Sequence, residues 1–214
     1  MKKREQNVYR YYIIFTTLLR LLQVRGYSTQ VTNCTFEEFQ VKYVDRNPIH
    51  DIFKEDLSIA AQKPNGDMVI VLFLAPGVKK AVSVQQIRLV AERLEQSHIA
   101  HCILIHEQML SSSSKKEIYK LFQGKQLETF EEDELLFCVL SHELVPTFET
   151  LTHSERQVLC KSFKITQAQL PRMLLSDPVC RFLGLKRGDI VRITRTSETA
   201  GEYVCYRYVC SGGG

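Results

Sequence analysis

The sequence contains no tryptophan, and only ten glycines and six prolines are spread over its 214 residues. Neither of the glycine-rich patterns that cradle nucleotide phosphates, G-x-x-x-x-G-K and G-x-G-x-x-G, occurs. There is also no G-x-S-x-G elbow and no C-x-x-C pair, so no serine or cysteine stands in a recognisable nucleophilic motif. The absence of these motifs disfavours enzymes that bind nucleotide phosphates in a glycine-rich loop and enzymes that use a covalent nucleophile.

The overall composition is that of an ordinary globular protein, with 44% apolar and 24% charged residues. It excludes a disordered tail, a collagen-like fibre and a coiled-coil rod. Lysine and arginine number 28 against 24 acidic residues, which gives a formal charge of +4. This mild excess permits a nucleic-acid neighbour without requiring one. The length fits one large domain or two small ones.

The seven cysteines are scattered along the chain and odd in number, which favours reduced thiols in a cytosolic or nuclear protein. Near the N-terminus, residues 11–24 form an apolar run after a basic start. Arg20 interrupts this run, which is too short to span a bilayer. Tyr12, Phe15, Leu19 and Leu22 recur at helical spacing, and Gly26 provides a helix stop. We therefore expect an amphipathic surface helix rather than a targeting segment.

The first half of the chain predicts alternating strands and helices. Thr35 and Glu38 form a capping box that begins a helix. The alternation of Leu57, Ile59 and Ala61, followed by Asn65-Gly66, predicts a hairpin over residues 56–74. The further expected elements are a helix from Ser83, a strand over 100–105, a polar loop over 111–114 in which one serine caps the next helix, a helix ended by Gly124, and a strand over 126–130. Such alternation implies a mixed sheet with helices packed on it. The acidic run 131–134 is expected to be a solvated face or a helix start.

The second half is basic, with eight lysines and arginines against two aspartates over residues 160–195. Thr152 and Glu155 form another capping box, and Val158, Leu159 and Phe163 are expected on one face of the helix that follows. A short helix is predicted from Pro178 to Gly184. Strands are predicted over 190–194 and 203–209, joined across residues 197–201. This half therefore reads as a separate α+β module.

The residues disfavour two further interpretations, a zinc site and a metal-dependent nuclease. His98, His101, Cys102 and His106 could suggest zinc, but His101 and Cys102 would point to opposite faces of a strand. A metal-dependent nuclease would need carboxylates on adjacent strands with a lysine nearby. Asp56 is expected to begin one strand, whereas the neighbouring run 68–74 carries no carboxylate, so this reading is disfavoured.

The C-terminal half closely resembles the assembly module of the RNA polymerase subunit 5 family. The matching segments are Gln169-Leu170-Pro171-Arg172, Ser176-Asp177-Pro178-Val179, Gly184-Leu185-Lys186-Arg187-Gly188-Asp189, and Ser197-Glu198-Thr199-Ala200-Gly201. Residues Arg25-Gly26-Tyr27, Phe36-Glu37-Glu38-Phe39 and His142-Glu143-Leu144-Val145-Pro146 resemble the N-terminal jaw domain of the eukaryotic subunit. The sequence departs from the family at Phe148, where members commonly carry histidine.

The resemblance implies an α/β jaw domain over residues 1–143, with a mixed sheet and flanking helices similar to a nuclease core without its chemistry. It implies a small α+β assembly domain over 144–210, and residues 211–214 read as a linker or disordered tail. A member of this family would be a non-catalytic, nuclear structural subunit of a DNA-dependent RNA polymerase. We accordingly expect no catalytic residue, metal, cofactor or membrane association.

The expected partners are the largest subunit and other subunits of RNA polymerase, together with downstream duplex DNA bound weakly and without sequence preference. General transcription factors are further candidates. We assign partner binding to Pro171, Arg172, Asp177, Pro178, Lys186, Arg187, Ser197, Glu198 and Thr199. We assign proximity to DNA to Lys115, Lys116 and Lys125. The alternative is a stand-alone nucleic-acid-binding module that uses the basic C-terminal half.

Overall fold

The computed structural model describes residues 2–30, 34–47, 51–74, 82, 84–96, 99, 101–108, 110–142, 145–197 and 201–212. The chain separates into two compact units, Met1–Phe137 and Cys138–Gly214. The domain boundary predicted between residues 143 and 144 stays a prediction, because both residues lie outside the described ranges.

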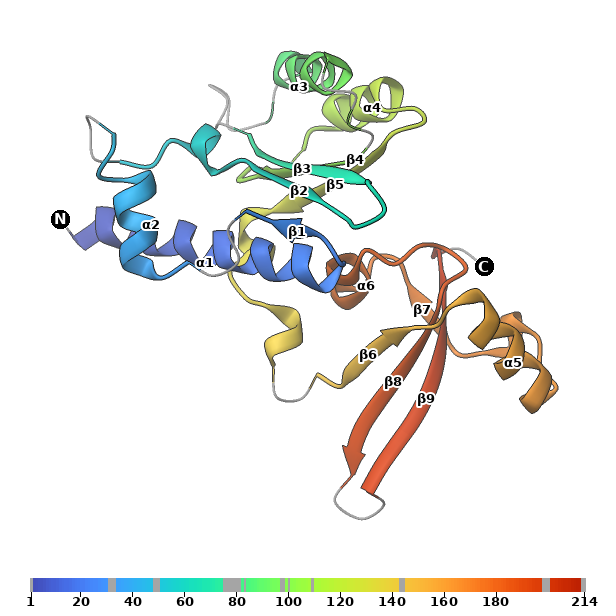
Figure 1. Cartoon of the computed structure of the whole chain (residues 1–214). Helices are drawn as coiled ribbons and strands as arrows, with labels where there is room; N and C mark the ends of the chain where they lie inside the picture. The colour runs from blue at the N-terminus through green and yellow to red at the C-terminus, as the bar shows by residue number, and fades with distance from the viewer. Residues whose placement is uncertain are drawn as a thin grey trace. The chain divides into compact units, whose positions relative to one another are not determined.

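The N-terminal unit is built on a five-stranded mixed sheet with the strand order β1-β2-β3-β4-β5 (Figure 1). The strands are β1 (Ser28–Thr29), β2 (Ile59–Gln62), β3 (Met68–Phe73), β4 (His101–His106) and β5 (Gln126–Glu131). Strands β1, β2 and β3 pair antiparallel, whereas β3, β4 and β5 pair parallel. The predicted mixed sheet is therefore confirmed, and the two-residue strand β1 is an addition that no sequence pattern announced.

Helices cover both faces of this sheet (Figure 1). On one face lie α3 (Val84–Gln96) and α4 (Ser112–Leu121), whose apolar side chains pack with Cys102 and Leu104 of β4. On the other face lie α1 (Lys2–Val24) and α2 (Phe36–Tyr43). Because β4 is the middle strand of the parallel set, every one of its side chains is buried.

Helix α1 differs from the predicted surface helix in both length and burial. It begins at Lys2, and Ile14, Leu18, Leu21 and Leu22 are fully buried, so it is a core helix. Helix α2 adds an aromatic cluster, in which the Phe15 and Phe39 rings lie 5.5 Å apart. The predicted capping box of Thr35 and Glu38 is present. None of the helices in the described part of the chain combines the length and apolar content that crossing a membrane needs.

Three local predictions in the N-terminal unit need correction. Asp56 does not begin a strand, because residues Lys54–Leu57 form a short 3-10 helix, η1. The predicted β2–β3 hairpin is confirmed, but it turns through a longer loop than the Asn65-Gly66 pair suggests. The Lys63 amide donates to the Asp67 carbonyl, and of the pair only Gly66 has a positive φ, of 94°. The expected serine cap of α4 is confirmed at Ser111, but residues 112–114 are helical rather than loop.

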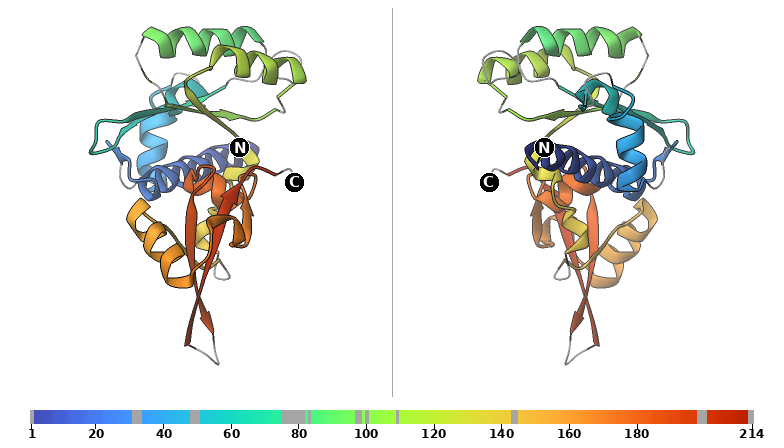
Figure 2. Two further views of the ribbon diagram at one scale, coloured as in Figure 1. Left: turned by 90° about the vertical axis from the view of Figure 1, so that its right-hand side faces the viewer. Right: turned by 90° about the vertical axis from the view of Figure 1, so that its left-hand side faces the viewer.

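The C-terminal unit is a four-stranded sheet with the order β6-β8-β9-β7. Its strands are β6 (Thr147–Thr150), β7 (Arg172–Leu174), β8 (Ile190–Ser197) and β9 (Gly201–Cys210). Strands β8 and β9 extend as an arm past the other elements of this unit (Figure 2). The predicted hairpin across residues 197–201 is confirmed, since Ser197 pairs with Gly201. Strands β6 and β7 are too short for a recognisable sequence pattern.

Two helices pack on this sheet, α5 (His153–Phe163) and α6 (Pro178–Leu183). The capping box of Thr152 with Glu155, the start at Pro178 and the left-handed stop at Gly184 are all confirmed. The apolar face of α5 is narrower than predicted. Leu159 is buried, but Val158 and Phe163 are 66% and 60% exposed.

The remaining described helical turns are short 3-10 helices: η2 (Glu132–Leu135), η3 (Val139–Ser141) and η4 (Gln167–Gln169). All seven cysteines are free thiols. Burial raises the pKa of Cys102 to about 12, so this thiol stays protonated at neutral pH. The predicted fold class, an α/β unit followed by a small α+β unit, is confirmed.

Candidate docking surface

The residues predicted to bind a partner gather mainly at one end of the C-terminal sheet. Pro171 and Arg172 lie where β7 begins, opposite Tyr208 of β9. The Tyr208 amide donates to the Pro171 carbonyl at 2.8 Å, which fixes the start of β7. Asp177 caps α6 by accepting a 2.8 Å hydrogen bond from the Val179 amide. Pro178 follows at the first helical position, where its missing N–H costs no hydrogen bond.

The turn that carries Lys186 and Arg187 is held at the same end of the sheet. The Gly188 amide donates to the Val209 carbonyl at 3.0 Å, so this turn lies against β9. The Asp189 carboxylate accepts from the Lys186 amide at 2.7 Å and closes the turn. The local fold therefore presents two consecutive cationic side chains on a backbone of fixed shape.

Arg156 of α5, which sequence reasoning missed, locks this turn in place. Its guanidinium donates to the Leu151 carbonyl at 2.9 Å and to the Gly188 carbonyl at 3.0 Å. It also pairs with the Asp189 carboxylate at 2.8 Å. A lone arginine in the first turns of a helix gave no signal of this role, because two of its partners, the Gly188 carbonyl and the Asp189 carboxylate, are more than 30 positions away in sequence.

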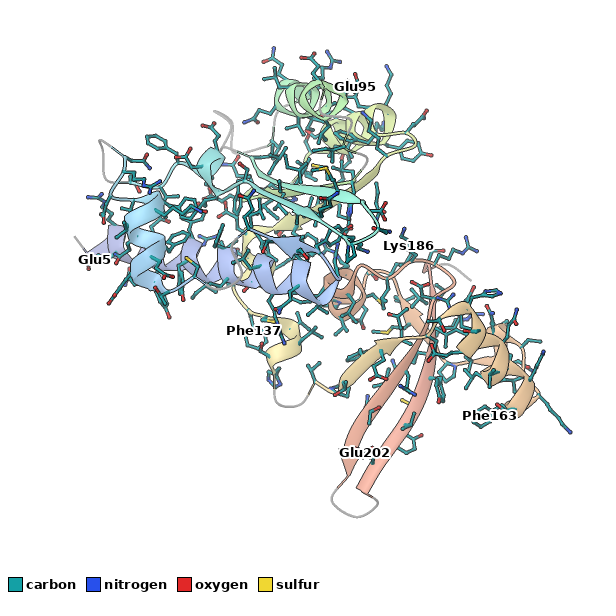
Figure 3. All side chains as sticks on the ribbon, in the orientation of Figure 1. Glu5, Glu95, Phe137, Phe163, Lys186 and Glu202 are labelled. Atoms are coloured by element: carbon teal, nitrogen blue, oxygen red, sulfur yellow. The ribbon has the colours of Figure 1, made fainter. Side chains whose placement is uncertain are left out.

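Ser197 lies apart from the other predicted partner-binding residues. It stands at the far end of β8, about 24 Å along the strand from Ile190 at roughly 3.4 Å per residue. Figure 3 shows this separation, with Lys186 in the turn at one end of the unit and Glu202 near the opposite end of β9. Glu198 and Thr199 lie outside the described residues.

The end of the C-terminal sheet where these predicted residues gather carries exposed positive charge. The side chains of Arg172, Lys186 and Arg187 are exposed, and they form no ion pair within the ranges that the structure describes. By contrast, Arg192 in the middle of β8 is paired with Glu149. The three unpaired cations are therefore available to carboxylates or carbonyl oxygens of another molecule.

The lysines predicted to lie near DNA belong to the α3–α4 layer of the N-terminal unit. Lys115 and Lys116 are exposed neighbours on α4. Lys125 lies in the turn after α4, and its ammonium is 3.5 Å from the Glu95 carboxylate. Lys125 is therefore the least available of the three for a phosphate.

Part of the acidic run 131–134 is buried, which corrects its interpretation as a solvated face. It does start a helix, η2, but Glu132 is only 1% exposed. Its carboxylate lies 2.6 Å from the Lys54 ammonium and 3.3 Å from the Arg10 guanidinium. Burial alone would lower the pKa of Lys54, but hydrogen bonds to Glu107 and Glu132 outweigh it and raise the pKa. This cluster ties α1 and η1 to the end of the sheet.

A second buried cluster joins the end of α1 to the sheet. The Glu128 carboxylate accepts two hydrogen bonds from Arg25, at 2.9 and 2.7 Å. His101 bridges Glu128 at 2.8 Å and the Tyr27 hydroxyl at 2.9 Å. Burial opposes ionisation of Glu128, but hydrogen bonds from His101 and Arg25 outweigh it and lower the pKa to about 2. These residues are far apart in the sequence, and no sequence pattern indicates that they form one cluster.

The histidine and cysteine cluster does not converge in the structure. His101 faces Tyr27 and Glu128, whereas Cys102 packs among the side chains of α3 and α4. His106 contacts the Gln108 carbonyl at 2.9 Å, and His98 lies outside the described residues. The described residues contain no group of three or more potential ligands suited to a metal ion.

Comparison with known proteins covers both units of the chain. The family model for RNA polymerase Rpb5, N-terminal domain, matches residues 5–94, and the model for the C-terminal domain matches residues 137–209. A Caenorhabditis elegans protein named DNA-directed RNA polymerases I, II, and III subunit RPABC1 is 32% identical over 98% of this chain and 100% of its own length.

Two further relatives extend the match. A Dictyostelium discoideum protein with the same RPABC1 name is 32% identical over 88% of this chain and 96% of its own length. An Arabidopsis thaliana protein named DNA-directed RNA polymerase subunit 5-like protein 1 is 28% identical over 97% of this chain and 99% of its own. The resemblance found in the sequence is thereby confirmed, and the chain belongs to the Rpb5 family of DNA-directed RNA polymerase subunits, proteins of transcription.

Proposed function

We propose that this chain is a non-catalytic structural subunit of a nuclear, multisubunit DNA-dependent RNA polymerase. Its C-terminal unit docks on the largest subunit, and its N-terminal unit forms part of the jaw near downstream DNA. The observation that carries the docking role is the exposed cationic group Arg172, Lys186 and Arg187. Arg156 holds the turn that carries Lys186 and Arg187, and pairing of β7 with β9 holds Arg172.

A fixed cationic surface suits assembly because little side-chain and loop entropy is lost on binding. The turn at residues 186–189 is already closed by its own hydrogen bonds, so it does not have to be ordered by the partner. Arginine can bind a carboxylate through two parallel hydrogen bonds, which fixes the orientation of the partner as well as its position.

The docking role predicts that Lys186→Glu with Arg187→Glu reduces incorporation of the chain into polymerase by about ten-fold. Two cations then become anions opposite the partner's acceptors, and like charges at an interface cost several kcal/mol. The measurement is co-purification of the tagged full chain with the largest subunit. Normal incorporation of the double variant would overturn this docking surface.

The matched control reverses two adjacent exposed lysines of the N-terminal unit. Lys115→Glu with Lys116→Glu makes the same change in charge, and we expect it to leave incorporation within two-fold of the unchanged chain. A loss of incorporation equal to that of the docking variant would point to net charge rather than to the surface itself.

The jaw role predicts weak DNA contact that depends on salt. In polymerase containing the Lys115→Glu, Lys116→Glu chain, the slope of log affinity for downstream duplex DNA against log salt falls by about two, because two phosphate contacts are lost. An unchanged slope would remove these lysines from the DNA contact. The same titration on the free chain tests the alternative: strong, steeply salt-dependent binding of duplex DNA by the free chain would favour a stand-alone nucleic-acid-binding module.

A further inference from the structure

The outer edge of β9 is open over most of its length. On one side β9 pairs with β8 from Gly201 to Tyr208. On the other side β7 pairs with β9 only at Tyr208, Val209 and Cys210. No strand in the described part of the chain therefore pairs with the outer edge over residues 201–207 (Figure 1).

The hydrogen-bond register identifies which backbone groups face outward. The Val209 amide donates to the Asp189 carbonyl, so the odd-numbered residues of β9 direct their N–H and C=O groups toward β8. The Tyr208 amide instead donates to the Pro171 carbonyl on the β7 side. By this alternation, Glu202, Val204 and Tyr206 present their backbone N–H and C=O groups at the open edge.

Pro171 ends the pairing with β7 at this point. In the parallel register of β7 and β9, the donor opposite the Tyr206 carbonyl would be the backbone nitrogen of residue 171. Proline has no N–H, so β7 leaves the Tyr206 carbonyl without a partner from that strand. The position beside Tyr206, Val204 and Glu202 is thus a vacant strand position that begins where β7 starts.

An apolar groove lies on the sheet face next to this vacant position. It has a volume of about 350 Å³ and is lined by residues of α5, β8 and β9, among them Val158, Phe163 and Tyr206. The rings of Phe163 and Tyr206 lie 6.4 Å apart, and Figure 3 shows Phe163 projecting from the end of α5. Val204 shares the face of Tyr206, two residues along the strand, and is 42% exposed.

An open edge with exposed apolar side chains is a liability for a free protein, because it invites pairing with any other strand. Natural sheets commonly protect such edges with a proline, a bulge or a covering element. Here the edge carries the exposed side chains of Tyr203 and Val204. Its charged residues are Glu202 near the hairpin end and the half-buried Arg207. These features favour an edge that is covered in an assembly.

The charges around the groove indicate the chemistry of the covering segment. Arg172 is exposed at the start of β7, and Lys161 and Lys164 are exposed on and just after α5. Glu155 and Arg192 line the groove itself, but both are already engaged, since Glu155 caps α5 and Arg192 pairs with Glu149. An acidic segment is therefore complementary to this surface.

We propose that an extended, acidic segment of the largest polymerase subunit adds to the open edge of β9 as an extra strand. Its backbone pairs with Glu202, Val204 and Tyr206, and one of its apolar side chains occupies the groove beside Phe163. Strand addition obtains affinity from main-chain hydrogen bonds and specificity from pockets for alternate side chains. This inference rests on the proposed function and specifies how the docking occurs.

The test uses amide hydrogen exchange at single-residue resolution on the full chain, alone and in complex with the largest polymerase subunit. In the free chain, the amides of Tyr203, Cys205 and Arg207 exchange slowly because they donate to β8, whereas those of Glu202, Val204 and Tyr206 exchange fast. In the complex, we expect the exchange of the second set to slow by at least ten-fold.

A pair of variants at one position separates the backbone donor from the side chain. Val204→Pro removes the outward N–H and leaves the β8 ladder intact, since proline is tolerated on an edge strand whose N–H faces solvent. Val204→Thr keeps the N–H. We expect the proline variant to bind the largest subunit about ten-fold more weakly and the threonine variant to bind within two-fold. Slow exchange of the inward amides of the free proline variant verifies its fold.

The outcomes separate this inference from the function on which it rests. If the complex forms but the outward amides still exchange fast and Val204→Pro binds normally, strand addition is wrong and docking stands. If the unchanged chain does not bind the largest subunit, the proposed function fails and the inference fails with it. If the outward amides become protected only as the free chain dimerises, the occupant is a second copy, which also overturns the proposal.

Discussion

Replacing Glu132 by glutamine is expected to lower the free energy of unfolding of the N-terminal unit by about 3 kcal/mol. Glu132 is 1% exposed and pairs with Lys54 at 2.6 Å, while the side chain of Lys54 is itself only 13% exposed. Removing one partner of a buried ion pair leaves the other charge without compensation. Because Lys54 keeps its ion pair with Glu107, the expected decrease in the free energy of unfolding lies at the lower end of the range for buried ion pairs.

The neighbouring acidic residue provides a matched control. Asp133 also contacts Arg10, at 2.9 Å, but its side chain is 79% exposed. Because exposed ion pairs contribute little, Asp133→Asn should change stability by less than 1 kcal/mol. The chain has no tryptophan, so unfolding in urea is best followed by hydrogen exchange of the buried β4 amides, which report on this unit alone. Equal effects of the two substitutions would contradict the predicted contribution of the buried Glu132 ion pair to stability.

Glu128→Gln should remove about 3 kcal/mol of stability at neutral pH and flatten the acid dependence of the N-terminal unit. The ordinary pKa of glutamate is 4.5, and hydrogen bonds from His101 and Arg25 overcome burial to lower that of Glu128 to about 2. A carboxyl group with a lowered folded-state pKa stabilises fully above pH 4.5. Its contribution declines as the pH falls from 4.5 toward 2.

The measurement is the free energy of unfolding of both proteins between pH 7 and pH 2. The unchanged chain should lose its advantage over Glu128→Gln in the window from about pH 4.5 to 2. Glu95→Gln serves as the control, because its partner Lys125 is 3.5 Å away and the Glu95 side chain is 66% exposed. A constant difference between Glu128→Gln and the unchanged chain across the whole pH range would contradict the lowered pKa.

Much of the fold could be predicted because local signals agreed with the tertiary structure. The capping boxes at Thr35 and Thr152 and the stops at Gly26 and Gly184 each set a helix end by backbone chemistry that does not depend on distant residues. The apolar run 68–74 contained a strand covered on both faces, as expected for the middle of a mixed sheet.

The predictions that were wrong depended on contacts between distant segments. Glu132 sits in an acidic run that would ordinarily face water, and Arg10, Tyr11 and Lys54, each more than 70 residues away, make its burial tolerable. Val158 and Phe163 extend the apolar pattern of α5 but remain exposed. They line an open groove beside the sheet instead of packing into the core. The role of Arg156 is equally invisible in the sequence, since it depends on backbone carbonyls that the fold brings within reach.

The N-terminal helix has a consequence for biosynthesis. Arg10 and Tyr11 meet Glu132 across 122 and 121 positions of sequence. At translation rates of about 5–20 residues per second, roughly 6 to 25 s pass between synthesis of the two halves of this cluster. For most of that interval the nascent polypeptide carries the apolar side of α1 without the complete sheet, because β5 ends only at Glu131. Chaperone engagement on the ribosome should therefore be strongest early in synthesis and should end once residue 132 has emerged.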